Sequence, residues 1–309
     1  MVKQQLEIGF FGLGRMGLGM VKRMCESKKV SVHAWNRSEE PRLDAKKEGA
    51  QVYADIDTLL SALKGKPKIA WLMLPAGAVT EEVFANVLSK LTKGDIIVDG
   101  ANSYIENTLK HAELAKAKGV HFFDVGVSGG TLPTTHQNGY PMMIGGDKKV
   151  YEQYLEPILE TFGRKGSFNL MGPCGSGHYV KMVHNAIEYG MMQAIAEGLD
   201  LLENGRFKGQ LDMNKITKTW QKGTIVEGLL MDMTVNALNN TNLNELSPHV
   251  DDNGEGRWAA SEAIKYAIPF DVNTRAVFAR FNSRDTNSYA FRLLAAIRNE
   301  FGSHKLHKK

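Results

Sequence analysis

Cysteine is scarce in this sequence, and its apolar runs are short. Its 309 residues include only two cysteines, Cys25 and Cys174, so neither a disulfide framework nor a cysteine-based metal cluster is expected. The longest apolar stretches, 69–74 and 195–202, are too short for a transmembrane helix or carry a charge. We therefore expect a cytoplasmic protein that is not embedded in a membrane.

A strong excess of charge of one sign is also missing. Lys and Arg number 38 against 34 Asp and Glu, a formal net charge of +4, and the basic residues are scattered apart from a short tail at 304–309. This balance argues against a nucleic-acid-binding surface and weakly favours small anionic partners. Hydrophobic residues make up 43% of the chain, which at this length predicts an ordered protein with two domains, or with one domain and a large appendage.

Short β-rich runs alternate with amphipathic helical stretches from residue 6 to about residue 146. This alternation is typical of a doubly wound parallel sheet with helices on both faces. The predicted strands span 6–11, 30–35, 68–74, 95–99 and 121–125. Helical patterns dominate after residue 146, and helices are expected at 175–202, 212–222, 226–238, 258–266 and 287–301. The sequence thus predicts an α/β domain, residues 1–174, followed by an all-α C-terminal domain, residues 175–309.

A glycine-rich turn follows the first predicted strand. Gly12, Gly14 and Gly17 form the pattern Gly-x-Gly-x-x-Gly and open an amphipathic helix. Glycines here permit a tight turn and close approach of the backbone to a pyrophosphate, and the helix N-terminus supplies free N–H groups. The pattern predicts a Rossmann-type dinucleotide site, with a merely structural turn as the alternative. The expected loop contacts are Gly12, Leu13, Gly14, Arg15, Met16 and Gly17.

Asn36, Arg37 and Ser38 follow the second predicted strand. An NAD-preferring site usually places a carboxylate there, about 20 residues past the loop, to bind the ribose hydroxyls. Arg37 is suited instead to pair with a 2′-phosphate, so NADP is the expected cofactor and NAD remains possible. The alternative interpretation of Arg37 is a solvated surface arginine.

Five polar residues recur on one face of the helix expected at 175–202. They are Lys181, His184, Asn185, Glu188 and Tyr189, at positions i, i+3, i+4, i+7 and i+8. The residues between them are apolar or small, which predicts a mostly buried helix with one polar stripe. Buried ionisable groups need partners, so the stripe lines either a cavity for a polar ligand or an internal ion-pair network. We favour the cavity.

The segment 175–189, Gly-Ser-Gly-His-Tyr-Val-Lys-Met-Val-His-Asn-Ala-Ile-Glu-Tyr, closely resembles the signature helix of 6-phosphogluconate dehydrogenases. The glycine turn and the segments 73–75, 99–103, 124–130, 276–280 and 298–304 agree with the same family. The stretch between Arg280 and Arg298 is far shorter than in the long members, as in the short form. The resemblance implies oxidative decarboxylation of 6-phosphogluconate to ribulose 5-phosphate and CO2 with reduction of NAD(P), a reaction in which no metal is needed.

By this resemblance, Lys181 is the general base that takes the proton of the substrate 3-hydroxyl, and Glu188 protonates C1 of the enediol that remains after CO2 leaves. His184 and Asn185 orient substrate hydroxyls, although a lone histidine in this position is more typical of a satisfied core residue. The resemblance adds Leu74, Pro75 and Asn102 to the cofactor site. It also implies that the substrate carboxylate is held by Asn102, Ser128, Gly129 and Gly130. The alternative for the Ser-Gly-Gly segment is a simple turn.

The resemblance places the substrate phosphate at Tyr189 and Arg280, with Arg298 and His304 reaching in from a second subunit. This arrangement implies a homodimer or a larger homo-oligomer. Asn253 and Glu255 stand where the long members carry Lys and Thr for the phosphate, and these two positions stay unassigned.

Two other functions remain open. A β-hydroxyacid dehydrogenase of the 3-hydroxyisobutyrate type would share the glycine turn and the helix lysine but lack the phosphate pocket. Glu188, Tyr189 and the segment 298–304 argue against it. A non-catalytic NADPH-binding protein would keep the fold without turnover, and the presence of both Lys181 and Glu188 argues against that alternative.

Overall fold

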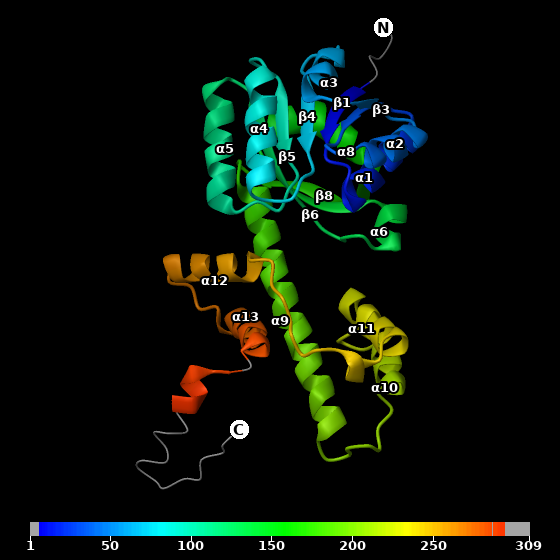
Figure 1. The fold of residues 1–309 in the computed structure, drawn as a ribbon, viewed down its shortest axis with the longest axis vertical. Helices are drawn as coiled ribbons and strands as arrows, with labels where there is room; N and C mark the ends of the chain where they lie inside the picture. The colour runs from blue at the N-terminus through cyan, green and yellow to red at the C-terminus, as the bar shows by residue number, and fades with distance from the viewer. Residues whose placement is uncertain (1–5, 286, 294–309) are drawn as a thin grey trace. The chain divides into compact units, whose positions relative to one another are not determined.

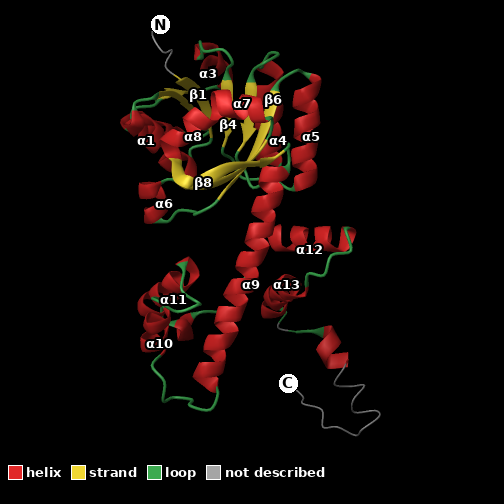
Figure 2. Ribbon diagram, turned by 180° about the vertical axis from the view of Figure 1, so that it is seen from behind, coloured by secondary structure: helices red, strands yellow, loops and turns green. Residues whose placement is uncertain are grey.

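The computed structural model of the chain describes residues 6–285 and 287–293. The chain divides into two compact units, Met1–His184 and Asn185–Lys309. The first unit combines a twisted sheet with helices, and the elements described in the second unit are all helical (Figures 1 and 2). This is the predicted order of an α/β domain followed by an all-α domain.

The sheet of the first unit has eight strands in the order β3-β2-β1-β4-β5-β6-β7-β8. Their bounds are β1 Leu6–Phe11, β2 Val30–Trp35, β3 Gln51–Tyr53, β4 Ile69–Leu72, β5 Ile96–Asp99, β6 His121–Val127, β7 Tyr140–Gly145 and β8 Gly163–Gly172. The pairs are parallel except that β7 runs antiparallel to β6. The strand order reverses between β1 and β4, and ligands of such sheets bind at that switch point.

The five predicted strands are confirmed as β1, β2, β4, β5 and β6, whereas β3, β7 and β8 were not predicted. The expectation that helices take over after residue 146 is wrong for β8. This strand, Gly-Arg-Lys-Gly-Ser-Phe-Asn-Leu-Met-Gly, lies at the edge of the sheet and is largely solvated, so it lacks the apolar run that marks the central strands.

Each face of the sheet has its own apolar core. Alternate residues point to opposite faces, so Ile8 and Phe10 enter one core while Phe11 enters the other. The first core is covered by α1 (Arg15–Ser27), α2 (Glu39–Lys47) and α8 (Glu156–Phe162), and the second by α3 (Ile56–Ala62), α4 (Ala78–Lys90) and α5 (Ile105–Ala117). Short helical segments, α6 Pro133–Asn138, α7 Lys148–Val150 and a π-helix Tyr151–Leu155, flank the last strands. The sheet is therefore doubly wound, as predicted.

Helix α9 (Ser176–Asn204) begins in the first unit and continues into the second. The further helices of the second unit are α10 Met213–Trp220, α11 Leu229–Asn240, a 3-10 turn Leu243–Glu245, α12 Glu255–Lys265 and α13 Asp271–Arg284. The predictions for α9 to α12 are confirmed within a few residues. Helix α13 was not predicted, and most of the helix expected at 287–301 lies outside the described residues.

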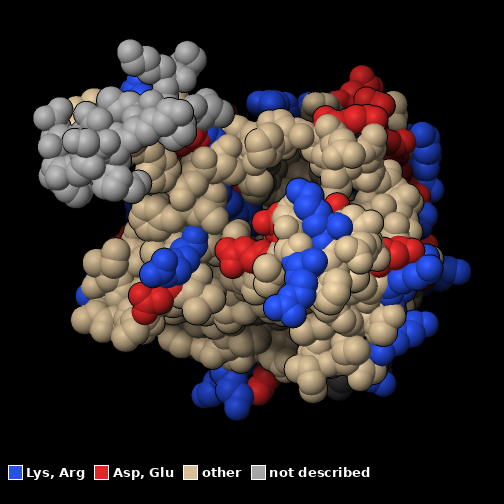
Figure 3. All heavy atoms as spheres, turned by 90° about the horizontal axis from the view of Figure 1, so that it is seen from below, with Lys and Arg blue, Asp and Glu red and all other residues tan. Residues whose placement is uncertain are grey.

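Within residues 6–285 and 287–293, no helix combines the length and the apolar character that crossing a membrane requires. On the described part of the face shown in Figure 3, Lys and Arg are interspersed with Asp and Glu over a mainly uncharged surface. The mixed charge agrees with the nearly balanced composition.

Candidate active site

Two of the three glycines in the turn after β1 are required by close packing. Gly12 has φ +107°, a conformation that favours glycine, and a Cβ built on it would lie 2.2 Å from the carbonyl oxygen of Met73. A Cβ on Gly17 would lie 2.2 Å from the carbonyl oxygen of Gly12. The backbone of the turn therefore packs closely against the end of β4 and against the first turn of α1.

Gly14 differs from these two glycines, because neither backbone strain nor packing within the chain requires it. It has φ −64° and ψ 179°, and no atom lies within 4 Å of a Cβ built on it. It is the N-cap of α1, whose first turn contains no acidic residue. A side-chain-free helix N-terminus of this kind suits the close approach of a pyrophosphate, so the turn fits a dinucleotide.

A cavity of about 630 Å³ adjoins this turn. Of the predicted cofactor residues, those that line it are Gly12, Gly14, Asn36, Arg37, Ser38, Leu74 and Pro75. The Asn36 side chain accepts a hydrogen bond from the Leu13 N–H at 3.0 Å, which ties the end of β2 to the glycine turn. Arg15, Met16 and Gly17 form the start of α1, and Asn102 is exposed on the turn after β5. The glycine turn, the end of β2 and the segment after β4 thus meet at the switch point.

Carboxylates that were not anticipated also line this cavity. They are Asp55, Asp57 and Glu82. Asp55 caps α3 and accepts hydrogen bonds from the Thr58 N–H at 2.7 Å and hydroxyl at 2.8 Å, which lower the pKa of Asp55. The aspartates follow β3, a strand too short to be predicted, although Asp55 directly before the apolar Ile56 is a typical N-cap signal.

The start of α9 is held by a buried carboxylate of the sheet. Asp124, on β6, is fully buried and accepts hydrogen bonds from the Gly175 N–H at 2.6 Å and from the His178 N–H at 2.8 Å. Backbone N–H groups in the first turn of a helix have no partner within the helix, and this carboxylate satisfies two of them. The first turn of α9 is therefore fixed relative to β6.

One turn further along α9, Lys181 packs directly on β6. Its side chain is only 5% exposed, and its Cβ lies 2.2 Å from where a Cβ on Gly126 would stand. The Lys181 Nζ is 3.4 Å from Nδ1 of His184, a half-buried residue. The base of the Lys181 side chain is thus held against Gly126, near the end of β6.

The Ser128 to Gly130 segment forms a turn directly after β6. Ser128 donates its N–H to the carbonyl of Pro141 at 2.9 Å, and Gly129 adopts φ +91°. Thr135 donates its hydroxyl to the Gly129 carbonyl at 3.0 Å. Ser128, Gly129 and Gly130 therefore form a turn at the carboxyl end of β6, the edge of such a sheet at which ligands bind. This position is consistent both with a simple turn and with a substrate contact.

In the second unit, two residues of the polar stripe join a hydrogen-bonded chain with the N-terminus of α12. Asn185 donates to Glu255 Oε2 at 2.6 Å, and Asn253 donates to the same oxygen at 2.9 Å. The Tyr189 hydroxyl donates to the Asn253 side chain at 2.6 Å. Asn253 and Glu255, left unassigned from the sequence, thus connect Asn185 with Tyr189.

Arg280 lies beside this chain of hydrogen bonds. Its guanidinium is 3.6 Å from the centroid of the Tyr189 ring and donates to the Asp251 carbonyl at 2.7 Å. Burial raises the pKa of Tyr189, so this phenol stays protonated at neutral pH. Tyr189 and Arg280, both expected at the substrate phosphate, thus lie in contact with each other, whereas Arg298 and His304 lie outside the described residues.

The predicted burial of α9 is only partly correct. Lys181, Asn185 and Tyr189 are buried and Glu188 is half-buried, but the apolar Ile187 and Met191 are 48% and 52% exposed. Three residues of the polar stripe are therefore buried together with the apolar Met182 and Ala186. We expected the apolar side chains between the polar residues to be buried, and this expectation is wrong for Ile187 and Met191.

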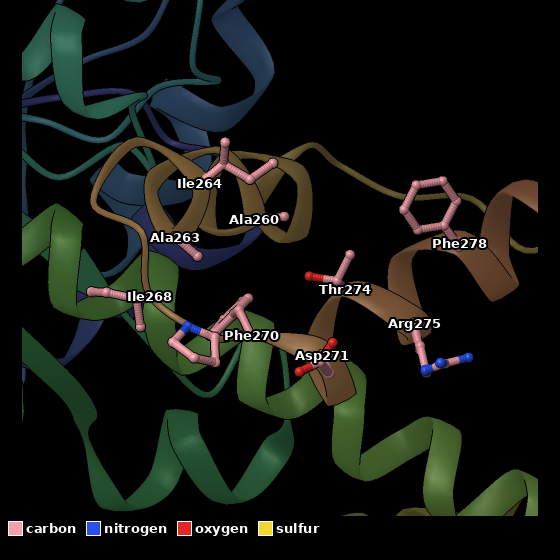
Figure 4. A pocket seen from close by; sticks show the side chains of 10 residues that line it. Ala260, Ala263, Ile264, Ile268, Phe270, Asp271, Thr274, Arg275 and Phe278 are labelled. Carbon is pink, nitrogen blue, oxygen red and sulfur yellow. The ribbon is translucent and has the colours of Figure 1, made fainter.

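A second cavity, of about 420 Å³, is bordered by α12 and α13 (Figure 4). Its wall is mainly apolar, and the start of α13 adds Asp271, Thr274 and Arg275. The predicted site residues are not part of its lining. Its chemistry is that of an apolar groove and differs from that of a sugar-phosphate site.

The doubly wound sheet, the glycine turn at its switch point and the adjoining cavity together define a protein of the NAD(P)-binding Rossmann class. The family model described as the NAD binding domain of 6-phosphogluconate dehydrogenase matches residues 7–174, and that of the C-terminal domain matches residues 177–292. The chain belongs to the 6-phosphogluconate dehydrogenase family.

Individual relatives agree. The chain is 33% identical to an NAD(+)-dependent, decarboxylating 6-phosphogluconate dehydrogenase of Haloferax volcanii, over 98% of this chain and 99% of that protein. It resembles the solved structure of Plasmodium falciparum 6-phosphogluconate dehydrogenase, studied with NADP+ and with 6-phosphogluconate, at TM-score 0.80 and 30% identity, over 98% of this chain and 66% of that longer one. A Mycobacterium tuberculosis 3-hydroxyisobutyrate dehydrogenase shares the fold, at TM-score 0.72 and 20% identity, over 90% and 94% of the two chains.

Proposed function

We propose that this protein is a short-form, NAD(P)-dependent 6-phosphogluconate dehydrogenase, which converts 6-phosphogluconate to ribulose 5-phosphate and CO2. The observation that carries the proposal is the placement of Lys181, a buried amine fixed against β6 by Gly126. This amine and the carboxylate of Glu188, two turns further along, lie on one face of a single helix. An amine and a carboxylate can serve as the base and the acid of the reaction.

In this proposal Lys181 removes the proton of the 3-hydroxyl. The dinucleotide, held by the glycine turn and by Arg37, would supply the hydride acceptor for C3. Protonated Lys181 then donates a hydrogen bond to the new 3-keto oxygen, which accepts the electrons of the C–C bond as CO2 leaves. Glu188 protonates C1 of the resulting enediol to give ribulose 5-phosphate.

The remaining site residues hold the substrate. His184 and Asn185 orient its hydroxyls, and Asn102, Ser128, Gly129 and Gly130 hold the carboxylate end. Tyr189 and Arg280 bind the phosphate, together with Arg298 and His304 from a second subunit in a homodimer or larger oligomer. Contact between Arg280 and Tyr189 supports the phosphate assignment, because a guanidinium binds phosphate bidentately.

The cofactor in this proposal is NADP, with NAD as the alternative. The position of Arg37 in the wall of the dinucleotide cavity supports a 2′-phosphate contact. Asp55 and Asp57 line the same cavity, and their charge opposes an additional phosphate. The preference depends on which of these groups lies nearer the ribose.

Two further parts of the proposal concern organisation and location. We assign residues 1–174 to cofactor binding and 175–309 to substrate binding and subunit association. We also place the protein in the cytoplasm, where its two free, half-buried cysteines would remain reduced.

A β-hydroxyacid dehydrogenase acting on unphosphorylated acids is the second candidate. The buried carboxylate of Glu255, hydrogen-bonded to Asn185 in the proposed substrate site, favours it, because a carboxylate repels a phosphate. Arg280 beside Tyr189 favours the phosphorylated substrate. The two candidates therefore differ in the group recognised at this end of the site.

The test compares 6-phosphogluconate, gluconate and 3-hydroxyisobutyrate as substrates of the purified protein, with either NADP+ or NAD+, by absorbance of the reduced cofactor. We expect turnover with 6-phosphogluconate and at least about a hundredfold lower kcat/KM for the other acids. Lys181→Ala should lower kcat by about a thousandfold or more and leave NADP+ affinity nearly unchanged. Lys149→Ala, an exposed lysine on α7, serves as the control. Preference for 3-hydroxyisobutyrate would establish the second candidate instead.

A further inference from the structure

A buried histidine outside the predicted site lies between two carboxylates. His111, on α5, is only 1% exposed, and its ring stacks on Phe84 with the centroids 3.9 Å apart. Its Nε2 lies 3.0 Å from Glu81 Oε2, and its Nδ1 lies 3.5 Å from Asp99 Oδ2, an ion-pair distance longer than a well-formed hydrogen bond. The imidazole thus bridges α4 and the end of β5.

Both carboxylates belong to segments that surround the proposed cofactor site. Asp99 ends β5 and accepts hydrogen bonds from the Ala101 N–H and the Ser103 hydroxyl, each at 3.0 Å. These bonds shape the turn that presents Asn102. Glu81 lies in the first turn of α4, and residues of that helix line the dinucleotide cavity. A group that joins Asp99 to Glu81 therefore joins the two segments.

The charges around His111 favour its protonated form. Burial opposes protonation, but the contacts with Asp99 and Glu81 outweigh it and raise the pKa of His111. Burial likewise opposes ionisation of Asp99, yet the contact with His111 and the nearby His178 hold the pKa of Asp99 below its usual range. His178, on α9, has its Nδ1 2.8 Å from the Thr108 hydroxyl. Only the imidazolium has an N–H donor on both nitrogens and can serve both carboxylates.

We propose that protonated His111 is a positioning residue of the dinucleotide site, which holds the turn carrying Asn102 against the first turn of α4 so that cofactor affinity falls when the ring loses its proton. The inference rests on the dinucleotide site of the proposed function. A histidine whose pKa is raised by folding stabilises its surroundings below its ordinary pKa of about 6.5, and the contribution is lost as the pH rises through the raised value. Weaker binding is therefore expected on the alkaline side.

The test measures dissociation constants of NADP+ and NAD+ by calorimetry from about pH 5.5 to 9. We expect the wild-type value to rise about tenfold across the titration of His111. His111→Gln cannot be protonated and should bind at every pH as weakly as the wild type does at high pH. Glu81→Gln removes one of the two carboxylates beside His111. The Glu81 side chain is 41% exposed, so the fold should persist. The midpoint of the pH profile should move to lower pH, because less negative charge then favours the protonated ring.

His249→Gln is the matched control, because His249 is an exposed histidine 3.0 Å from a carboxylate, that of Asp251, in the second unit. It should retain the wild-type pH profile. A profile of the same shape in wild type and His111→Gln would overturn the inference while leaving the proposed function intact. An unchanged midpoint in Glu81→Gln would also overturn it, and this variant decides the matter if His111→Gln does not fold. If neither NADP+ nor NAD+ binds at any pH, both the inference and the proposed function are refuted.

Discussion

The Cβ of Lys181 lies against the backbone of Gly126, where a Cβ on residue 126 would stand only 2.2 Å away. No real Cβ contact is that short, so a side chain at 126 and the present position of Lys181 are incompatible. The glycine on β6 thus sets the depth at which the proposed catalytic amine sits on the sheet.

Gly126→Ala should therefore displace Lys181 and lower kcat by about a hundredfold, since misplacement of a catalytic group by 1 Å costs about that much. NADP+ affinity should stay within about twofold, because the glycine turn is untouched. Gly198→Ala is the control. Gly198 lies on α9, the helix that carries Lys181, and an added Cβ there meets open space. An unchanged kcat in Gly126→Ala would show that turnover does not depend on this contact.

Arg37→Ala should weaken NADP+ binding by about tenfold and NAD+ binding by less than about twofold, because only NADP+ carries the 2′-phosphate. Titration calorimetry with both cofactors measures the two constants. Lys47→Ala removes an exposed positive charge on the neighbouring helix α2 and should change neither. If the ratio of the two constants is the same in Arg37→Ala as in wild type, Arg37 does not select the cofactor.

Arg280→Gln should raise KM for 6-phosphogluconate by about tenfold or more, with a smaller effect on kcat, because a charged phosphate contact is lost far from the reacting carbons. Arg275→Gln changes an exposed arginine on the same helix, which lines the apolar groove of Figure 4. This control should leave KM unchanged. Equal effects of the two substitutions would remove Arg280 from the phosphate site.

Asp252 should contribute stability that acid removes. Burial alone would raise the pKa of Asp252, but Arg284 and Arg257, each 2.9 Å from one of its oxygens, lower it below the usual value. A carboxyl whose pKa is lowered by folding stabilises the protein above its unfolded pKa of about 3.9 and loses this contribution as the pH falls through the folded value. Asp252→Asn should reduce the free energy of unfolding at neutral pH by about 2 kcal/mol.

Urea unfolding of wild type and Asp252→Asn measures this effect. The difference between the two proteins should shrink when the pH is lowered below about 4. A difference of the same size at neutral and acidic pH would mean that the ion pairs are not its cause.

Local sequence patterns predicted the parts of the site that lie on one element. The glycine turn and the stripe from Lys181 to Tyr189 repeat with the geometry of a turn and of a helix, so their spacing is visible in the sequence. Contacts between distant segments left no such pattern. Asn185 and Glu255 are 70 residues apart and meet only because α12 begins beside α9. His111 likewise bonds to Glu81, 30 residues away.

Strands β3 and β8 were also missed because contacts with other segments, rather than a local pattern, determine them. β3 has only three residues, and β8 is an exposed edge strand with Arg164 and Lys165 near its start. Their pairing depends on neighbouring strands rather than on their own apolar content. Because β3 was missed, Asp55 and Asp57 were not placed in the cofactor cavity.

The central claim is oxidative decarboxylation, and the most direct test is the ratio of CO2 to reduced cofactor. Purified protein is supplied with 6-phosphogluconate carrying 13C in its carboxyl group and with NADP+ or NAD+, and labelled CO2 is measured together with absorbance of the reduced cofactor. The account predicts about one CO2 for each cofactor reduced and neither product with Lys181→Ala. Reduced cofactor without CO2, or no turnover of this substrate by the wild type, would contradict it.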